Sequence, residues 1–145
     1  MECLRELSQY FEIIVFTASH GCYANVVLDY LDPKEQYIHH RLFRESCVQT
    51  EEGVYVKDLR ILANRDLSNV VLVDNAAYSF GFQIENGVPI LEFTNDTSDM
   101  ELRYLADYLL KGHYYSDLRD YNRENLRLVE MSQRKFEEIE SEIKF

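Results

Sequence analysis

The sequence predicts an α/β fold, namely an open parallel sheet with helices on both faces and a small antiparallel insertion. Helix-like and strand-like patterns alternate along the chain, which is typical of this class. Two apolar runs, residues 13–15 and 70–73, lead into small polar residues, Thr17 in the first case and Asp74 and Asn75 in the second. Because the carboxyl ends of parallel strands lie along one edge of a sheet, polar residues at two such ends predict a site there.

The first third of the chain is predicted to form a helix, a strand and a second helix. Leu4, Leu7 and Phe11 have helical spacing and predict a short helix before a strand at residues 12–17. The second helix has one apolar face, which is formed by Tyr23, Val26, Val27, Tyr30 and Leu31. We expect this helix to end at Asp32, because the residue before a proline avoids the α-helical region.

The middle of the chain changes from helical to alternating spacing. Residues 37–43 and 54–56 are predicted to form short strands around a turn at residues 51–53, which together make the antiparallel insertion. Further along, residues 88–91 predict another strand, which Pro89 places near a sheet edge or at the start of the strand.

The last third is predicted to be helical. Polar residues 96–99 can cap a helix at about residues 100–110, whose apolar face consists of Leu102, Leu105, Ala106 and Leu109. After Gly112 the composition becomes charged, and a series of mostly apolar residues at intervals of three or four predicts one long amphipathic helix from Leu118 onwards. We therefore expect a folded domain at residues 1–112 and a charged helical tail at residues 113–145.

Composition narrows the class of protein and of partner. The 145 residues fit one domain, and 46% hydrophobic residues argue against a mainly disordered chain. A formal net charge of -11 argues against non-specific binding to nucleic acid or to an anionic membrane. The three cysteines match no metal or redox spacing and predict reduced thiols. With no spanning segment or signal peptide in view, we expect an intracellular protein of the nucleus or cytoplasm.

Four polar residues suggest the chemistry of the site. Thr17, Asp74 and Asn75 follow the two strands, and Lys57 lies between those strands in the sequence. A hydroxyl, an ammonium and a carboxylate beside an amide suit a phosphoryl group held next to a divalent cation.

A series of short motifs resembles the small carboxy-terminal-domain phosphatases, also called NLI-interacting factor-like phosphatases, of the haloacid dehalogenase superfamily. The motifs are Phe-Thr-Ala-Ser at residues 16–19, Arg-Leu-Phe-Arg-Glu-Ser-Cys at 41–47, Tyr-Val-Lys-Asp-Leu at 55–59, Arg-Asp-Leu at 65–67 and Val-Asp-Asn at 73–75. The resemblance runs in order from about residue 4 to residue 110 and implies a haloacid-dehalogenase-like fold. It also implies a Mg²⁺-dependent phosphoserine/phosphothreonine phosphatase that acts on a phosphoprotein through an aspartyl-phosphate.

The resemblance assigns a role to each candidate residue. Thr17 matches the threonine that donates to a phosphoryl oxygen, and Lys57 matches the lysine that neutralises phosphate charge. Asp74 matches the Mg²⁺ ligand, and Asn75 matches the adjacent amide, with expected contacts to the metal and the phosphate.

Other residues match the expected substrate groove, or differ from the family pattern near the site. Tyr23 and Arg44 match positions near the substrate groove. His20 differs from the apolar residue expected in that groove, and Ala76 and Ala77 replace a common Ser-Pro, so substrate preference is open.

The family's first motif, Asp-x-Asp-x-Thr/Val, does not occur in these 145 residues. In the family this motif carries the aspartate nucleophile, the general acid and a strand that lies centrally in the sheet. We therefore expect two strands with unpaired edges, which a preceding segment or a partner chain would complete, and no turnover by this chain alone. A non-catalytic binding module, or an interaction protein that uses its C-terminal helix, remains the alternative.

Overall fold

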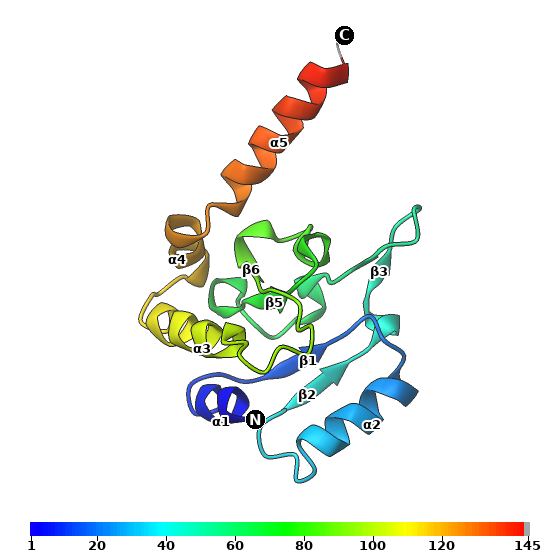
Figure 1. Ribbon diagram of the computed structural model, residues 1–145, viewed down its shortest axis with the longest axis vertical. Helices are drawn as coiled ribbons and strands as arrows, with labels where there is room; N and C mark the ends of the chain where they lie inside the picture. The colour runs from blue at the N-terminus through cyan, green and yellow to red at the C-terminus, as the bar shows by residue number, and fades with distance from the viewer. Residues whose placement is uncertain (144–145) are drawn as a thin grey trace.

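Residues 1–143 are described by the computed structural model, in which six short strands form three two-stranded sheets (Figure 1). The parallel pairs are β1 (Ile14–Phe16) with β2 (His40–Leu42), and β5 (Leu72–Asp74) with β6 (Gly87–Pro89). The antiparallel pair is β3 (Val48–Gln49) with β4 (Tyr55–Val56). The predicted α/β class with parallel strands is confirmed, but β1 and β5 do not pair with each other, so the parallel sheet is in two halves.

The predicted antiparallel insertion was wrong in its first half. Residues 37–43 were expected to belong to it, but β2 lies in the main sheet, with Val15 of β1 opposite Arg41. The insertion is the hairpin β3 and β4 alone, and Gly53 in its turn has a φ of 84°, which favours glycine. Alternating spacing identifies a strand, but it does not identify the partner of that strand, which here is reached through the crossover helix α2 (Gly21–Leu31).

One helical layer covers both halves of the parallel sheet. Helices α1 (Glu2–Leu7) and α3 (Glu101–Gly112) pack together through Leu7, Ala106 and Leu109. The same cluster is contacted by Ile13, which precedes β1, and by Val71 and Val73 at β5. The two half-sheets are therefore held under a common cover although no strand joins them.

The opposite face of β5 packs against short 3-10 turns. Leu72 lies in a second cluster with Leu59 of η2 (Leu59–Ile61) and Phe80 of η4 (Ala77–Phe80). The remaining turns are η1 (Arg44–Ser46), η3 (Leu67–Asn69) and η5 (Ile84–Asn86). Strand β5 is thus covered on both faces, as expected for a buried strand of an α/β fold.

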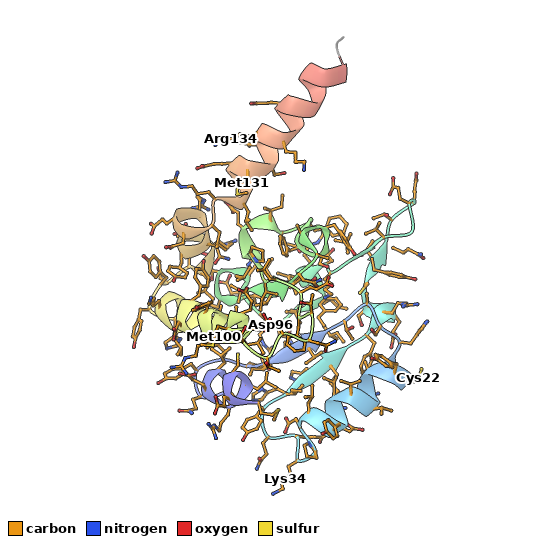
Figure 2. All side chains as sticks on the ribbon, in the orientation of Figure 1. Cys22, Lys34, Asp96, Met100, Met131 and Arg134 are labelled. Atoms are coloured by element: carbon orange, nitrogen blue, oxygen red, sulfur yellow. The ribbon has the colours of Figure 1, made fainter. Side chains whose placement is uncertain are left out.

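The apolar face that the sequence shows on α2 points mainly to solvent. Ala24 and Leu28 are the buried residues of this helix, whereas Tyr30 is 86% and Val26 is 70% exposed. Figure 2 shows Cys22, in the first turn of α2, at the outer side of the molecule.

The C-terminal region differs from the single long helix expected there. It forms α4 (Leu118–Asn125) and α5 (Leu128–Ile143), and the break between them includes Arg127, whose φ is 52°. Helix α4 packs on the body, since Leu118, Tyr121 and Asn122 are buried. Helix α5 projects away from the body and carries Met131 and Arg134 (Figures 1 and 2). The domain boundary at residue 112 stays a prediction, and residues 144–145 lie outside the described part.

A bidentate ion pair joins the segments that lead into β1 and β5. Arg65 donates from Nε to Glu12 Oε2 at 2.6 Å and from Nη2 to Oε1 at 2.7 Å. The contact spans 53 residues of sequence and therefore links the two half-sheets near the amino ends of their strands. Among the helices of residues 1–143, none is long and apolar enough to cross a bilayer.

We expect Gly87→Ala to destabilise the fold by about 1 to 3 kcal/mol, because overpacking forces side chains out of place. A Cβ at residue 87 would lie 2.4 Å from Phe80 Cδ2, inside the second cluster. Urea unfolding measures the effect, with Gly81→Ala as the control, whose Cβ would meet only the Tyr78 carbonyl oxygen, at 3.2 Å. Adding Phe80→Leu to Gly87→Ala should recover part of the lost free energy of unfolding. If Gly87→Ala and Gly81→Ala lower the free energy of unfolding equally, the packing argument is contradicted.

We also expect the Glu12–Arg65 pair to make stability depend on acid pH. The hydrogen bonds from Arg65 lower the pKa of Glu12 from 4.5 to about 2. Because the pKa is lower in the folded state, the stabilisation is full above about pH 4.5 and is lost as the pH falls toward 2. Between pH 7 and pH 3 the urea midpoint of Glu12→Gln should therefore fall less than that of the wild type. Glu6→Gln, which removes an exposed carboxylate, should behave like the wild type.

Candidate functional site

Lys57 and Asp74 form a buried ion pair at the carboxyl end of β5. Lys57 follows β4 directly, and its backbone N–H donates to the Ser79 carbonyl at 2.8 Å. Its ammonium group contacts Asp74 Oδ2, and the two side chains are 10% and 8% exposed. The other carboxylate oxygen, Oδ1, accepts from the Ala76 N–H at 2.8 Å. Two charges that far from water are tolerable because they neutralise each other and are hydrogen-bonded.

Thr17 lies at the carboxyl end of β1. Its backbone N–H extends the pairing with β2 by donating to the Leu42 carbonyl at 2.9 Å. Its Oγ1 accepts from the Ser19 N–H at 3.1 Å, so the hydroxyl proton can be donated to another acceptor. This is the polarity that a phosphoryl oxygen needs.

Cys47 lies beside the end of β1, a position that the sequence did not single out as part of the site. Its thiol lies 3.9 Å from the Thr17 carbonyl oxygen. Burial raises the pKa of Cys47, while the positive charges of Lys57 and Arg44 oppose this rise and Asp74 adds to it. Its thiol also lies 3.9 Å from the Phe43 carbonyl oxygen. Its place as the last residue of the motif at 41–47 was the one available signal.

Arg44 is held against the segment that follows β1. Its Nε donates to the Ala18 carbonyl at 2.6 Å, and its Nη1 lies 2.8 Å from His20 Nε2. Its guanidinium carbon lies 5.0 Å from the centre of the Tyr55 ring, which is within cation–π range. The structure thus brings Arg44 to the Thr17 end of the site.

Tyr23 is less closely associated with these residues. It lies on α2 and is 66% exposed. Its role at the substrate groove stays a prediction.

The two strand edges between Thr17 and Asp74 have no partner strand in the described part of the chain. Thr17 and Ile13 bond to the β2 side, so the alternate residues Ile14 and Phe16 direct their N–H and C=O groups away from β2. Asp74 accepts from Ile90 on the β6 side, so Val73 directs its backbone groups away from β6. Each half-sheet therefore offers one free edge beside a candidate residue.

The donor set fits a Mg²⁺ ion only in part. Mg²⁺ takes oxygen ligands and commonly uses one or two carboxylates together with water and substrate phosphate. Asp74 supplies one carboxylate whose oxygens contact Lys57 and Ala76, while Asn75 is exposed beside it. Among residues 1–143, no group of three or more His, Cys, Asp or Glu side chains could hold a metal ion. The arrangement is thus suited to bind a phosphoryl group and supplies at most part of a metal site.

Comparison with known proteins relates this geometry to a family. Residues 1–119 match the family described as NLI interacting factor-like phosphatase. The chain is 42% identical over 130 residues to CTD small phosphatase-like protein 2 of Dictyostelium discoideum. The match covers 90% of this chain and 22% of that protein. The chain is 49% identical over 106 residues to CTD small phosphatase-like protein 3 of Caenorhabditis elegans, covering 73% of this chain and 36% of the relative. The chain thus spans about a third of these relatives or less.

A solved structure supports the fold. The RNA polymerase II CTD phosphatase Fcp1 of fission yeast, in an R271A form bound to beryllium fluoride, superposes with a TM-score of 0.52. The two sequences are 19% identical, and the match covers 90% of this chain and 38% of that chain. Phosphatases of this type generally use Mg²⁺. The extent of the family match shows that the chain belongs to the NLI interacting factor-like phosphatases.

Proposed function

We propose that residues 1–119 form the phosphate-binding part of a Mg²⁺-dependent phosphoserine/phosphothreonine protein phosphatase. The observation that carries this proposal is that Thr17 lies at the carboxyl end of β1 with a hydroxyl proton that can be donated, while the buried Lys57–Asp74 pair lies at the carboxyl end of β5. Family membership supplies the reaction class, and the phosphoprotein substrate follows from it.

In this proposal each residue acts on the phosphoryl group or beside it. Thr17 donates its hydroxyl proton to a phosphoryl oxygen. Lys57 turns part of its hydrogen bonding from Asp74 to the phosphate, where a preorganised positive charge stabilises the charge that develops during transfer. Asp74, with Asn75 next to it, is the proposed protein contact of Mg²⁺. When bound, that ion would polarise the phosphoryl oxygens.

The nucleophile must then come from outside the described residues. A strand inserted between β1 and β5 would pair with the free groups of Ile14, Phe16 and Val73, and its carboxyl end would lie between Thr17 and Asp74. That end is where the family's first motif would place its aspartates. We infer that a segment preceding these residues, or a partner chain, provides the strand.

A non-catalytic phosphate-binding module is the second candidate. It is favoured by the state of Asp74, whose oxygens are already engaged by Lys57 and the Ala76 N–H. In that case the ion pair would be structural, and phosphate would be held by Thr17 and Arg44. In both cases we propose that the protein acts in the nucleus or the cytoplasm.

We predict that the 145-residue chain alone shows no Mg²⁺-dependent turnover of p-nitrophenyl phosphate, and that fusing a first-motif strand to it creates activity. In the fusion, Lys57→Ala should lower the rate about 100-fold or more, the scale for a lost charge-stabilising group. Lys34→Ala, at an exposed lysine of the loop after α2, is the matched control and should leave the rate unchanged. If the unfused chain turns over the substrate, and Asp74→Ala abolishes that turnover, then the chain does not need an added strand for activity and the proposal is refuted.

We further predict that a peptide containing the first motif raises the melting temperature of the chain when it is added in trans. Strand addition satisfies backbone groups that otherwise meet only water, and main-chain hydrogen bonds supply the affinity. The control is the same peptide with proline at two alternate positions, which cannot pair on both sides. If the chain melts at the same temperature with either peptide, it does not have two unpaired strand edges between which a strand can bind, and the prediction is wrong.

A further inference from the structure

His20 occupies an unusual position beside the candidate site. It is the N-cap residue of α2, yet its side chain makes no capping hydrogen bond. Its Nε2 lies instead 2.8 Å from Nη1 of Arg44, a residue 24 positions further along the chain. The imidazole is exposed, so burial does not force this contact.

The chemistry of the pair determines the state of the histidine. A guanidinium group donates hydrogen bonds and cannot accept them. Nε2 of His20 must therefore be the acceptor, which requires a neutral ring with its proton on Nδ1. In this state His20 holds the guanidinium group of Arg44 at Nη1, while the Ala18 carbonyl holds it at Nε.

Arg44 carries a positive charge that no described carboxylate neutralises. The ion pairs of the structure involve other basic residues, and Arg44 is held by a carbonyl, an imidazole and the Tyr55 ring. Of the five N–H donors of a guanidinium, two are used in these contacts. The remaining donors lie on Nη1 and Nη2, and an N–H from either nitrogen can donate a charge-assisted hydrogen bond to a carboxylate.

We propose that His20 is a positioning residue that holds Arg44 to receive an acidic side chain adjacent to the phosphorylated residue of the substrate. The inference rests on the proposed function, because it concerns the peptide on either side of the phosphoryl group bound at Thr17. A chain of net charge -11 repels acidic peptides at long range. A preference for an acidic peptide must therefore come from a positive charge that is held in place near the site. Arg44 is such a charge, and its backbone N–H also bonds to the Ser19 carbonyl at 3.1 Å.

The first test measures the tautomer of His20 in the full chain by nitrogen NMR of the imidazole. The proposal expects the proton on Nδ1, and expects the Arg44 Nε–H signal to shift in His20→Ala but to stay near its wild-type position in His20→Gln. The amide oxygen of glutamine can accept from Nη1 in place of the imidazole. A proton on Nε2, or an Arg44 signal that ignores His20→Ala, overturns the positioning role whether or not the chain binds phosphate.

The second test compares two fluorescent phosphoserine peptides that differ only in glutamate or glutamine after the phosphoserine. Anisotropy should show that the wild-type chain binds the glutamate peptide about 5-fold more tightly, the scale for a partly exposed charged hydrogen bond. His20→Ala should reduce this preference to below about 2-fold, and His20→Gln should restore it. Equal binding of both peptides by the wild type, or a preference that His20→Ala leaves intact, overturns the inference alone. Binding of neither peptide overturns the proposed phosphate site and, with it, the substrate part of the inference.

Discussion

The pairing of Lys57 with Asp74 is the interaction on which the site depends. A buried charge that loses its partner destabilises a protein by about 3 to 5 kcal/mol, so neither residue can be removed without consequence for the fold. The pair also connects two separate parts of the chain, because Lys57 ends the β3–β4 hairpin and Asp74 ends β5. The hairpin therefore acts as a support that brings a lysine to the end of the parallel sheet.

The second constraint is that each half of the parallel sheet has only two strands. Two-stranded sheets are marginal by themselves, so their stability must come from what packs on them. The α1–α3 cluster supplies this on one face through Ile13, Val71 and Val73, and the Glu12–Arg65 pair fixes the strands at their amino ends. The two half-sheets are thus held together by side-chain contacts and not by strand pairing, which is why the parallel sheet can be divided.

Local patterns predicted most elements but not their partners. Strand β1 and helices α1 and α3 follow from periodicity within a few residues, and they were predicted. The pairing of β2 with β1 was missed, because parallel register depends on a crossover and not on the 37–43 segment itself. The break at Arg127 was missed because the series of mostly apolar positions, spaced three or four residues apart, continues across it. In the site, motif resemblance identified Lys57 and Asp74, whereas the contact between His20 and Arg44 required three-dimensional proximity.

Charge balance supports the proposal that groups outside the described residues complete the site. A phosphoryl group carries about -1.5 to -2 charges at neutral pH. Asp74 neutralises Lys57, whereas Arg44, which donates to the Ala18 carbonyl next to Thr17, takes part in none of the ion pairs of the described residues. One guanidinium cannot compensate a dianion and also an approaching carboxylate nucleophile, since like charges within a few ångströms repel strongly away from water. A divalent cation at Asp74 would reverse this balance. It would also free Lys57 for the phosphate, because the carboxylate that now holds the ammonium would bind the metal instead.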